Sequence, residues 1–422
     1  MRRKLIATML SVAVIGTMLT GCGESKNSSE VEQEVQTEET KEESGIVTLK
    51  VWGATDDQAL LAEMVESFKA KYAGEAEFDI TIEAVEEGEC RKTLLTDVEN
   101  GADVFSFADD HLLSMVAGGA LTPVNNAEEV KKANVEGAVE ASSVNDTLYA
   151  YPMTAHNGYF MYYDKSVFSE GVLASFELML NVAAAANKKV TMDWTSGYYL
   201  FSFFGNTGLN LSMNDDGITM DCNWNTTEGD IKGIDIAKAM QTFAVHPGFL
   251  NAGDAGLVEG AKNGTVAAGI SGVWSANSLK EAWGSNYAAV KLPSYTCGGK
   301  QVQMASFCGY KMVGVNAYSK HQDWSLKLAD WLTNEENQKL RFEKRGLGPS
   351  NINAANSSEV NSNAAINAVL AQNEFAVLQR VSGKYWEPMV EFGKTMAMGN
   401  PETNLQELLD NTVASITATA AN

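Results

Sequence analysis

The sequence is poor in several kinds of residue, and each shortage excludes a class of site or partner. It has four histidines in 422 residues, with no HxxxH or HExxH spacing, so a transition-metal site is not expected. Lysine and arginine number 31 against 54 acidic residues, and the formal net charge of −23 argues against nucleic acids and anionic lipid surfaces as partners. The apolar run over residues 5–19 is shorter than the roughly 20 residues that a membrane-spanning helix needs.

Cysteine is also scarce, with five residues in the chain. Apart from Cys22, the others are Cys90, Cys222, Cys297 and Cys308, which form an even set without a close CxxC pair. Four cysteines allow three pairings, so the sequence leaves both disulfides and free thiols open.

The N-terminus has the pattern of an export signal. Arg2, Arg3 and Lys4 precede the uncharged apolar run, which is the order of a secretion signal. The stretch Leu19-Thr20-Gly21-Cys22 resembles the lipobox of bacterial lipoproteins. That resemblance implies cleavage of residues 1–21 and a lipid on Cys22, which would anchor the protein at the extracellular face of a bacterial cell membrane. The alternative is a plain signal peptide with an incidental cysteine.

Residues 22–45 are expected to form a tether. Between Gly23 and Ser44 the chain is almost entirely polar and cannot bury enough apolar surface to offset the entropy of ordering. A flexible segment of this length has a root-mean-square reach of about 26 Å. It would hold a folded body just off a membrane.

The body from Gly45 onward is long enough for two domains and has an α/β pattern. Apolar residues alternate over 47–51 and then recur at helical spacing over 60–72, which predicts a strand followed by a helix. The same reasoning predicts further strands at 78–84, 102–107, 159–163, 265–270 and 311–315, and helices at 111–118, at 324–345 and in two pieces over 391–420. Ligands of such folds lie after the carboxyl ends of strands, which directs attention to residues 52–57 and 107–111.

Six blocks of the body, in chain order, are "VTLKVWG", "ADVFSFADDHLLSMVAGGALTPV", "LYAYPMTAHNGYFMYYDKSVF", "LVEGAKNGTVAAGISGVWSANSL", "YAAVKLPSY" and "CGYKMVGVNAYS…LADWLTNEENQ". Together these blocks resemble the solute-binding proteins of ABC sugar importers, specifically the maltose and maltodextrin-binding family. The resemblance implies a two-lobed α/β periplasmic-binding-protein fold with an inter-lobe cleft and three crossover segments, near 153–155, 306–309 and 349–353. Lobe 1 would comprise residues 46–153 plus 308–350, and lobe 2 residues 154–307 plus 351–422.

The resemblance also implies the ligand and its contacts. A sugar ring has apolar faces, which suit flat aromatics, and a rim of hydroxyls, which suits polar side chains. The matching positions are Trp274, Trp386 and Tyr198 as stacking residues, Phe107 in place of a tryptophan, Asp110 as an acidic contact, and Thr55, Asp56 and Asp57 in a hydroxyl-binding loop. His111 occupies a position usually held by arginine and His156 one usually held by glutamate, so the exact oligosaccharide stays open.

Several of these residues have simpler interpretations. The tryptophans expected to be core residues are Trp52, Trp283, Trp324 and Trp331. Asp109 and Asp110 could cap the following helix. The segment Asn214 to Gly217 could bind calcium, but it lacks a later bidentate glutamate and favours a turn.

The expected function is capture of maltooligosaccharides and their delivery to an ABC permease by a monomer without cofactor. Another oligosaccharide, for example a β-linked one, is the alternative within this class. A glycoside hydrolase is the rival class, since carboxylates and tryptophans also serve those enzymes, but no pair of carboxylates at strand ends stands out. A structural adhesin would need internal repeats, and the sequence has none that we could find.

Overall fold

The computed structural model describes residues 45–214 and 218–419. The predicted signal, Cys22 and the tether lie outside these residues, as do three of the four residues of the predicted turn at 214–217. In the described part of the chain, every helix is too short or too polar to cross a bilayer.

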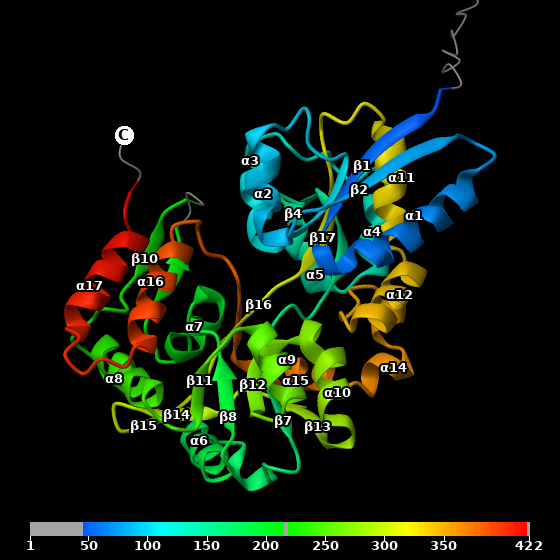
Figure 1. Ribbon diagram of the computed structural model, residues 1–422. Helices are drawn as coiled ribbons and strands as arrows, with labels where there is room; N and C mark the ends of the chain where they lie inside the picture. Colours follow the sequence, from blue (N-terminus) through cyan, green and yellow to red (C-terminus); the bar gives the residue numbers. More distant parts are fainter. Residues whose placement is uncertain (1–44, 215–217, 420–422) are drawn as a thin grey trace, which may run out of the picture. The chain divides into compact units, whose positions relative to one another are not determined.

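Two five-stranded sheets form the two lobes of the body (Figure 1). The first sheet has the order β2-β1-β3-β17-β6. Its strands are β1 (Val47–Gly53), β2 (Phe78–Ala84), β3 (Val104–Ala108), β6 (Ala150–Thr154) and β17 (Lys311–Val315). The predicted strands at 78–84 and 311–315 are confirmed to the residue.

The second sheet has the order β11-β8-β12-β7-β13. Its strands are β7 (Tyr159–Asp164), β8 (Lys189–Met192), β11 (Phe249–Asn251), β12 (Val266–Gly272) and β13 (Tyr287–Val290). In both sheets the first three strands of the order are parallel to one another. Each of the last two strands pairs antiparallel with the strand before it in the order. The two lobes therefore share one plan, although the sequence shows no repeat.

Short strand pairs complete the β structure. They are β4 (Ser143–Val144) with β5 (Thr147–Leu148), β9 (Leu211–Met213) with β10 (Met220–Cys222), β14 (Ser294–Cys297) with β15 (Lys300–Gln303), and β16 (Ser306–Cys308) with β18 (Ala376–Leu378).

Helices surround each sheet (Figure 1). The segments that supply the first sheet carry 3-10 helices η1 (Thr55–Asp57) and η2 (Asp109–His111) with α1 (Gln58–Tyr72), α2 (Glu87–Thr96), α3 (Leu112–Ala117), α4 (Ala127–Ala133), α5 (Glu136–Ala141), α11 (Gln322–Thr333) and α12 (Glu335–Arg345). The remaining segments carry η3 (Glu170–Val172), η4 (Val273–Ser275), η5 (Gly284–Asn286) and η6 (Asn373–Phe375) with α6 (Phe176–Ala185), α7 (Gly197–Phe204), α8 (Gly233–Ala244), α9 (Asp254–Lys262), α10 (Ala276–Trp283), α13 (Ile352–Ala355), α14 (Ser358–Asn361), α15 (Ala364–Gln372), α16 (Trp386–Ala397) and α17 (Leu405–Ile416).

The apolar residues that recur at helical spacing in the sequence form the buried face of α1. Its apolar side chains are buried, and Phe68 packs edge-on against Trp324 and Trp331 of α11 with ring centroids 6.4 Å apart in both pairs. Trp52 and Trp283 are buried as well. The core prediction is thus confirmed for Trp52 and Trp283, whereas Trp324 and Trp331 are partly buried and pack against the core.

One helix prediction is wrong. The single helix expected over 324–345 is divided between α11 and α12 at Asn334, whose ψ of 170° leaves the helical region. The Asn334 side chain accepts a hydrogen bond from the amide of Asn337 and so caps α12. Two acidic residues follow in the first turn of α12, where they favour a helix start.

The three predicted crossover segments lie side by side. The amide of Ala155 donates to the carbonyl of Gly348 at 2.9 Å, and the amide of Asn157 donates to the carbonyl of Gly309 at 3.1 Å. Thr154 and Pro349 form an isolated β-bridge. Backbone hydrogen bonds therefore join all three connections between the lobes, while the lobe boundaries predicted from the resemblance stay predictions.

The cysteine question left open by the sequence is answered for the described residues. Cys90, Cys222, Cys297 and Cys308 are all free thiols.

Candidate functional site: a cleft between the lobes

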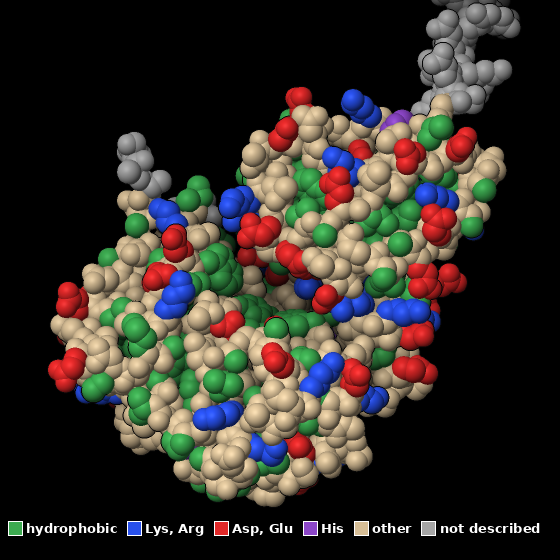
Figure 2. All heavy atoms as spheres, viewed as in Figure 1, with side chains coloured by type: hydrophobic (Ala, Val, Ile, Leu, Met, Phe, Trp, Pro, Cys, Tyr) green, Lys and Arg blue, Asp and Glu red, His purple; other side chains and the backbone are tan. Residues whose placement is uncertain are grey.

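A cavity of about 760 Å³ lies between η1 of the first lobe and α9, η4 and α10 of the second. Its lining residues are Asp56, Asp254, Ala255, Val258, Glu259, Lys262, Asn263, Trp274, Ser275 and Ser278. Figure 2 shows the molecule hollowed in this region, with apolar side chains on the wall below and acidic side chains along the rim above. Of the residues predicted as ligand contacts, Asp56 and Trp274 line this cavity from opposite lobes.

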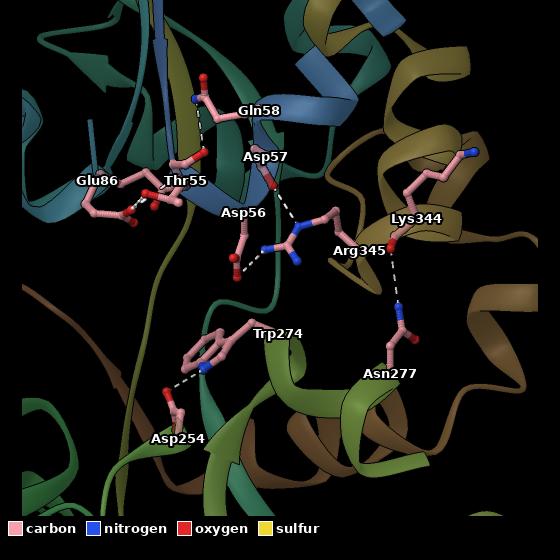
Figure 3. Close-up of polar contacts among 12 residues, drawn as sticks. Thr55, Asp56, Asp57, Gln58, Glu86, Asp254, Trp274, Asn277, Lys344 and Arg345 are labelled. Atoms are coloured by element: carbon pink, nitrogen blue, oxygen red, sulfur yellow. Dashed lines mark hydrogen bonds and ion pairs between the residues drawn. The ribbon is translucent and has the colours of Figure 1, made fainter. Parts of the chain in front are cut away.

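Trp274 is set in the cleft by the end of β12. The strand ends at Gly272, and Trp274 is the middle residue of η4, which leads directly into α10. The ring is partly exposed, and its Nε1–H donates a hydrogen bond of 2.8 Å to the carboxylate of Asp254 (Figure 3). A partly exposed indole with its polar atom already bonded leaves an apolar ring face for a ligand.

The other two predicted stacking residues lie on α7 and α16. The Tyr198 ring centroid is 6.4 Å from that of Trp274, and the Tyr198 hydroxyl donates to the carbonyl of Asn157 at 3.0 Å. Trp386 begins α16, close enough that a Cβ on Gly197 would lie 3.5 Å from its indole. All three rings are partly exposed. The structure therefore places Tyr198 beside Trp274, and Trp386 beside the start of α7, the helix that carries Tyr198.

The predicted hydroxyl-binding loop divides into different roles. Asp56 is exposed and pairs with Arg345 at 3.2 Å, whereas the Asp57 side chain is 4 % exposed and accepts from Arg345 Nε at 2.8 Å (Figure 3). Asp57 also pairs with the buried Arg341. Burial alone would raise the pKa of Asp57, but the charges of the two arginines hold it below its ordinary value. The prediction of Asp57 as a ligand contact is corrected, because its carboxylate is buried and already paired.

Thr55 is exposed but has a partner. Its hydroxyl donates to Glu86 Oε1 at 2.7 Å, and its amide donates to the same oxygen at 3.0 Å. A ligand hydroxyl could still donate to Thr55, since a hydroxyl oxygen keeps its acceptor capacity.

Phe107 does not lie in the cleft. It is 0 % exposed and belongs to the core beneath α2 and α3, with its ring centroid 5.9 Å from that of Phe105. In a strand the side chains two residues apart share a face, so Phe105 and Phe107 both pack against Leu94 of α2 and Met115 of α3. The prediction that Phe107 stands in for a stacking tryptophan is wrong.

Asp110 and His111 lie together at the end of β3, in η2. Their side chains are each 5 % exposed, with Asp110 Oδ2 3.8 Å from His111 Nε2. Burial raises the pKa of Asp110, while the opposing charge of His111 lowers it, and burial lowers the pKa of His111. Asp110 Oδ1 and His111 Nδ1 are buried without a hydrogen-bond partner. Buried polar atoms of this kind ordinarily have partners, and these two have none among the described residues.

The neighbouring Asp109 contacts a crossover segment. Its carboxylate accepts from the amide of Tyr310 at 3.3 Å. Burial, followed by the negative charge of Asp110, raises the pKa of Asp109 to about 7. Neither Asp109 nor Asp110 accepts a helix-capping hydrogen bond, so the capping interpretation does not describe them.

His156 lies on the first crossover segment and has a positive φ of 66°. This conformation is uncommon for residues other than glycine. Its Nδ1 is buried without a partner, and burial lowers the pKa of the ring. A neutral imidazole with a free nitrogen can accept a hydrogen bond from a hydroxyl.

The sequence did not reveal two residues of the cleft. Asp254 begins α9 just after β11, a position after a strand end that the general rule for α/β sheets could have indicated. Arg345 ends α12, far along the chain from the loop that it holds. Within residues 45–214 and 218–419, no group of three or more histidine, cysteine, aspartate or glutamate side chains is placed to hold a metal ion.

Known proteins are similar in sequence to this chain over most of its length. A galactooligosaccharide-binding protein of Bacillus subtilis is 24 % identical over 395 residues, which cover 89 % of this chain and 87 % of that protein. A maltooligosaccharide ABC transporter solute-binding lipoprotein of Streptococcus pneumoniae is 24 % identical over 418 residues, covering 94 % and 91 % of the two chains.

Solved structures share the fold. A Thermus thermophilus maltotriose binding protein bound with maltotriose has a TM-score of 0.73 at 18 % identity and covers 87 % of this chain and 99 % of its own. A cyclo/maltodextrin-binding protein complexed with maltotetraose has a TM-score of 0.67 at 22 % identity, covering 89 % and 98 %. The two-lobed periplasmic-binding-protein fold predicted from the sequence is thereby confirmed. The profile of one family matches residues 63–368, which is most of the folded body, and the chain belongs to that family, the bacterial extracellular solute-binding proteins.

Proposed function

We propose that this protein captures maltooligosaccharides in the cleft between its lobes and delivers them to the permease of an ABC transporter. The observation that carries the proposal is a group of three partly exposed aromatics on adjoining elements, Trp274, Tyr198 and Trp386, of which Trp274 lines a cavity that also has carboxylates in its wall. Ring faces of a sugar pack on aromatics, and its hydroxyls donate to carboxylates. The names of the Streptococcus relative and of several structural neighbours support the same ligand class.

The two lobes would contribute differently to binding. The second lobe supplies the three aromatics, while Asp56, Asp110 and His111 of the first lobe supply polar contacts. Because Phe107 is buried, the first lobe has no ring at that position to stack on a sugar. A ligand that contacts both lobes stabilises a closed arrangement, since the crossover segments let the lobes move as bodies.

A galactooligosaccharide is the second candidate ligand. The Bacillus relative carries that name, and its similarity covers 89 % of this chain. A different sugar could be accommodated at three positions. Phe107 is buried and offers no ring for stacking, and positions 111 and 156 are histidines.

Calorimetry with a panel of oligosaccharides tests the proposal. The purified protein should bind maltotriose and maltotetraose at least tenfold more tightly than cellotriose or a galactotriose, and long incubation should release no shorter sugars. Tighter binding of the galactotriose would replace the proposed ligand by the second candidate. Appearance of hydrolysis products would contradict a binding function altogether.

We propose further that Cys22 carries a lipid and that the protein works as a monomer on the extracellular face of the membrane. Replacing Cys22 with alanine should release the protein from the cell into the medium and leave sugar binding unchanged, because the 22-residue tether separates the anchor from the body. Cell fractionation with immunoblotting measures the release, and Cys90→Ala is the matched control. Retention of Cys22→Ala on the cell would contradict the lipid anchor.

A further inference from the structure

The carboxylate of Asp254 accepts hydrogen bonds from several side chains of the second lobe. Its Oδ1 accepts from the Tyr199 hydroxyl at 2.9 Å and from the Ser271 hydroxyl at 2.7 Å. Its Oδ2 accepts from Trp274 Nε1 at 2.8 Å and from the Tyr199 hydroxyl at 3.1 Å. The Tyr199 hydroxyl has a single proton, which it shares between the two oxygens, so three donors occupy three of the about four acceptor positions of the carboxylate. Although Asp254 lines the cavity, most of the acceptor capacity of its carboxylate is already used by donors within the protein.

The donors come from three different elements. Tyr199 belongs to α7, Ser271 to β12 and Trp274 to η4, while Asp254 itself begins α9. Ser271 donates its single hydroxyl proton to Asp254, so in the 2.8 Å contact between the two hydroxyls Ser275 is the donor to Ser271. The contacts therefore tie α7, β12 and η4 to a carboxylate at the start of α9.

The backbone on the other side of the indole is equally restrictive. A Cβ added to Gly272 would lie 2.1 Å from two carbon atoms of the Trp274 ring, so the indole rests directly on a residue without a side chain. The ring is thus held by Gly272 against one face. Its nitrogen is held by Asp254, a contact drawn in Figure 3. Rotation of the indole would break the Nε1 hydrogen bond.

We propose that Asp254 is a positioning residue that holds the Trp274 indole in the orientation that stacks on a sugar, and that it affects sugar binding through this ring. This inference rests on the proposed function for its ligand. Fixing an otherwise mobile side chain before binding avoids an ordering cost of about 0.5–1.5 kcal/mol, which corresponds to about a three- to tenfold difference in affinity.

A double-mutant cycle tests whether Asp254 acts through Trp274. Asp254→Ala should weaken maltotetraose binding about three- to tenfold in calorimetry. The same substitution should have no further effect in a Trp274→Ala background, because the ring that it positions is gone. An equal loss in both backgrounds would overturn the inference, as it would mean direct contact with the sugar or a general disturbance of the lobe.

Two further variants, Asp254→Asn and Asp164→Asn, show whether a loss of affinity comes from misfolding. Asp254→Asn keeps the shape and one acceptor oxygen, so it should fold and still lose part of the network. Asp164 accepts from the amide and hydroxyl of Ser166 at 2.8 and 2.6 Å in the same lobe, which makes Asp164→Asn a matched control with no expected effect on affinity. An effect of Asp164→Asn as large as that of Asp254→Asn would overturn the inference.

A measurement without sugar separates this inference from the proposed function. The indole N–H signal of Trp274 in a nitrogen-15 spectrum, assigned by its loss in Trp274→Phe, should shift and exchange faster with water in Asp254→Asn. An unchanged Trp274 signal would overturn the inference. If no sugar of the panel binds the parent protein and the Trp274 signal still moves, the ligand assignment fails while the positioning role of Asp254 stands.

Discussion

Trp274→Ala and Trp386→Ala should each weaken the binding of maltotriose by about thirtyfold or more without changing the fold. Truncation of a buried aromatic anchor costs about 2 kcal/mol or more, and every 1.4 kcal/mol is a factor of about ten in affinity. Calorimetry gives the affinity, and thermal unfolding shows whether the fold is retained. Tyr318→Ala is the matched control, because Tyr318 is an exposed aromatic of the first lobe outside the cleft, 49 % exposed.

The placement of the three aromatics on adjoining elements explains why both tryptophans should contribute to maltotriose binding. A curved α-1,4-glucan presents successive ring faces along an arc, and the structure supplies Trp274, Tyr198 and Trp386 from adjoining elements. A straight β-1,4-glucan cannot meet all three rings without lifting a sugar ring away, so cellotriose should bind poorly to every variant. Full maltotriose affinity in both tryptophan variants would contradict the assignment of the aromatics as the ligand platform.

Replacing Asp57 with asparagine should destabilise the folded protein by about 3–5 kcal/mol, because removal of one partner leaves a buried charge unpaired. That charge is Arg341, whose side chain is 2 % exposed and whose Nε has no hydrogen-bond partner. Urea unfolding measures the free energy. Asp56→Asn is the control, since Asp56 is exposed and pairs at the surface with Arg345, an interaction worth about 0–1 kcal/mol.

The pH dependence of this effect has a definite sign. The arginine charges lower the pKa of Asp57 against the effect of burial, so its ionised form is favoured by folding. Its contribution to stability is present above the unfolded pKa of about 3.9 and is lost as the pH falls through the lower folded value. The difference between the parent and Asp57→Asn should therefore be constant near neutrality and shrink in acid below about pH 4. Equal stability of Asp57→Asn and Asp56→Asn at pH 7 would contradict the buried pair.

Local sequence patterns predicted six of the ten strands of the two large sheets, because alternation and helical spacing are properties of neighbouring residues, but they did not predict β6, β8, β11 and β13. The strands at 78–84 and 311–315 and the helices before and after Gly399 are examples of correct predictions. Asn334 shows where a local signal was present but overlooked, since an asparagine followed by two glutamates is a usual helix start. The predicted binding protein, as opposed to a glycoside hydrolase, is confirmed by the family to which the chain belongs.

The errors in the candidate site have a different origin. Asp57 looked like a loop residue free for a ligand, but its partners Arg341 and Arg345 lie more than 280 residues along the chain. Phe107 was placed by its resemblance to a stacking position, whereas α2 and α3 cover it. Such contacts depend on how distant segments pack, which no local pattern records. Trp274, Trp386 and Tyr198 stay predictions as ligand contacts, although the structure brings them together.

A crystal structure of the protein with maltotetraose tests the central claim most directly. The account predicts an oligosaccharide in the cleft between the lobes, with sugar rings stacked on Trp274 and Trp386 and hydroxyls within hydrogen-bond distance of Asp56 or Asp110. An oligosaccharide bound outside this cleft, or one in the cleft that touches neither tryptophan, would contradict it.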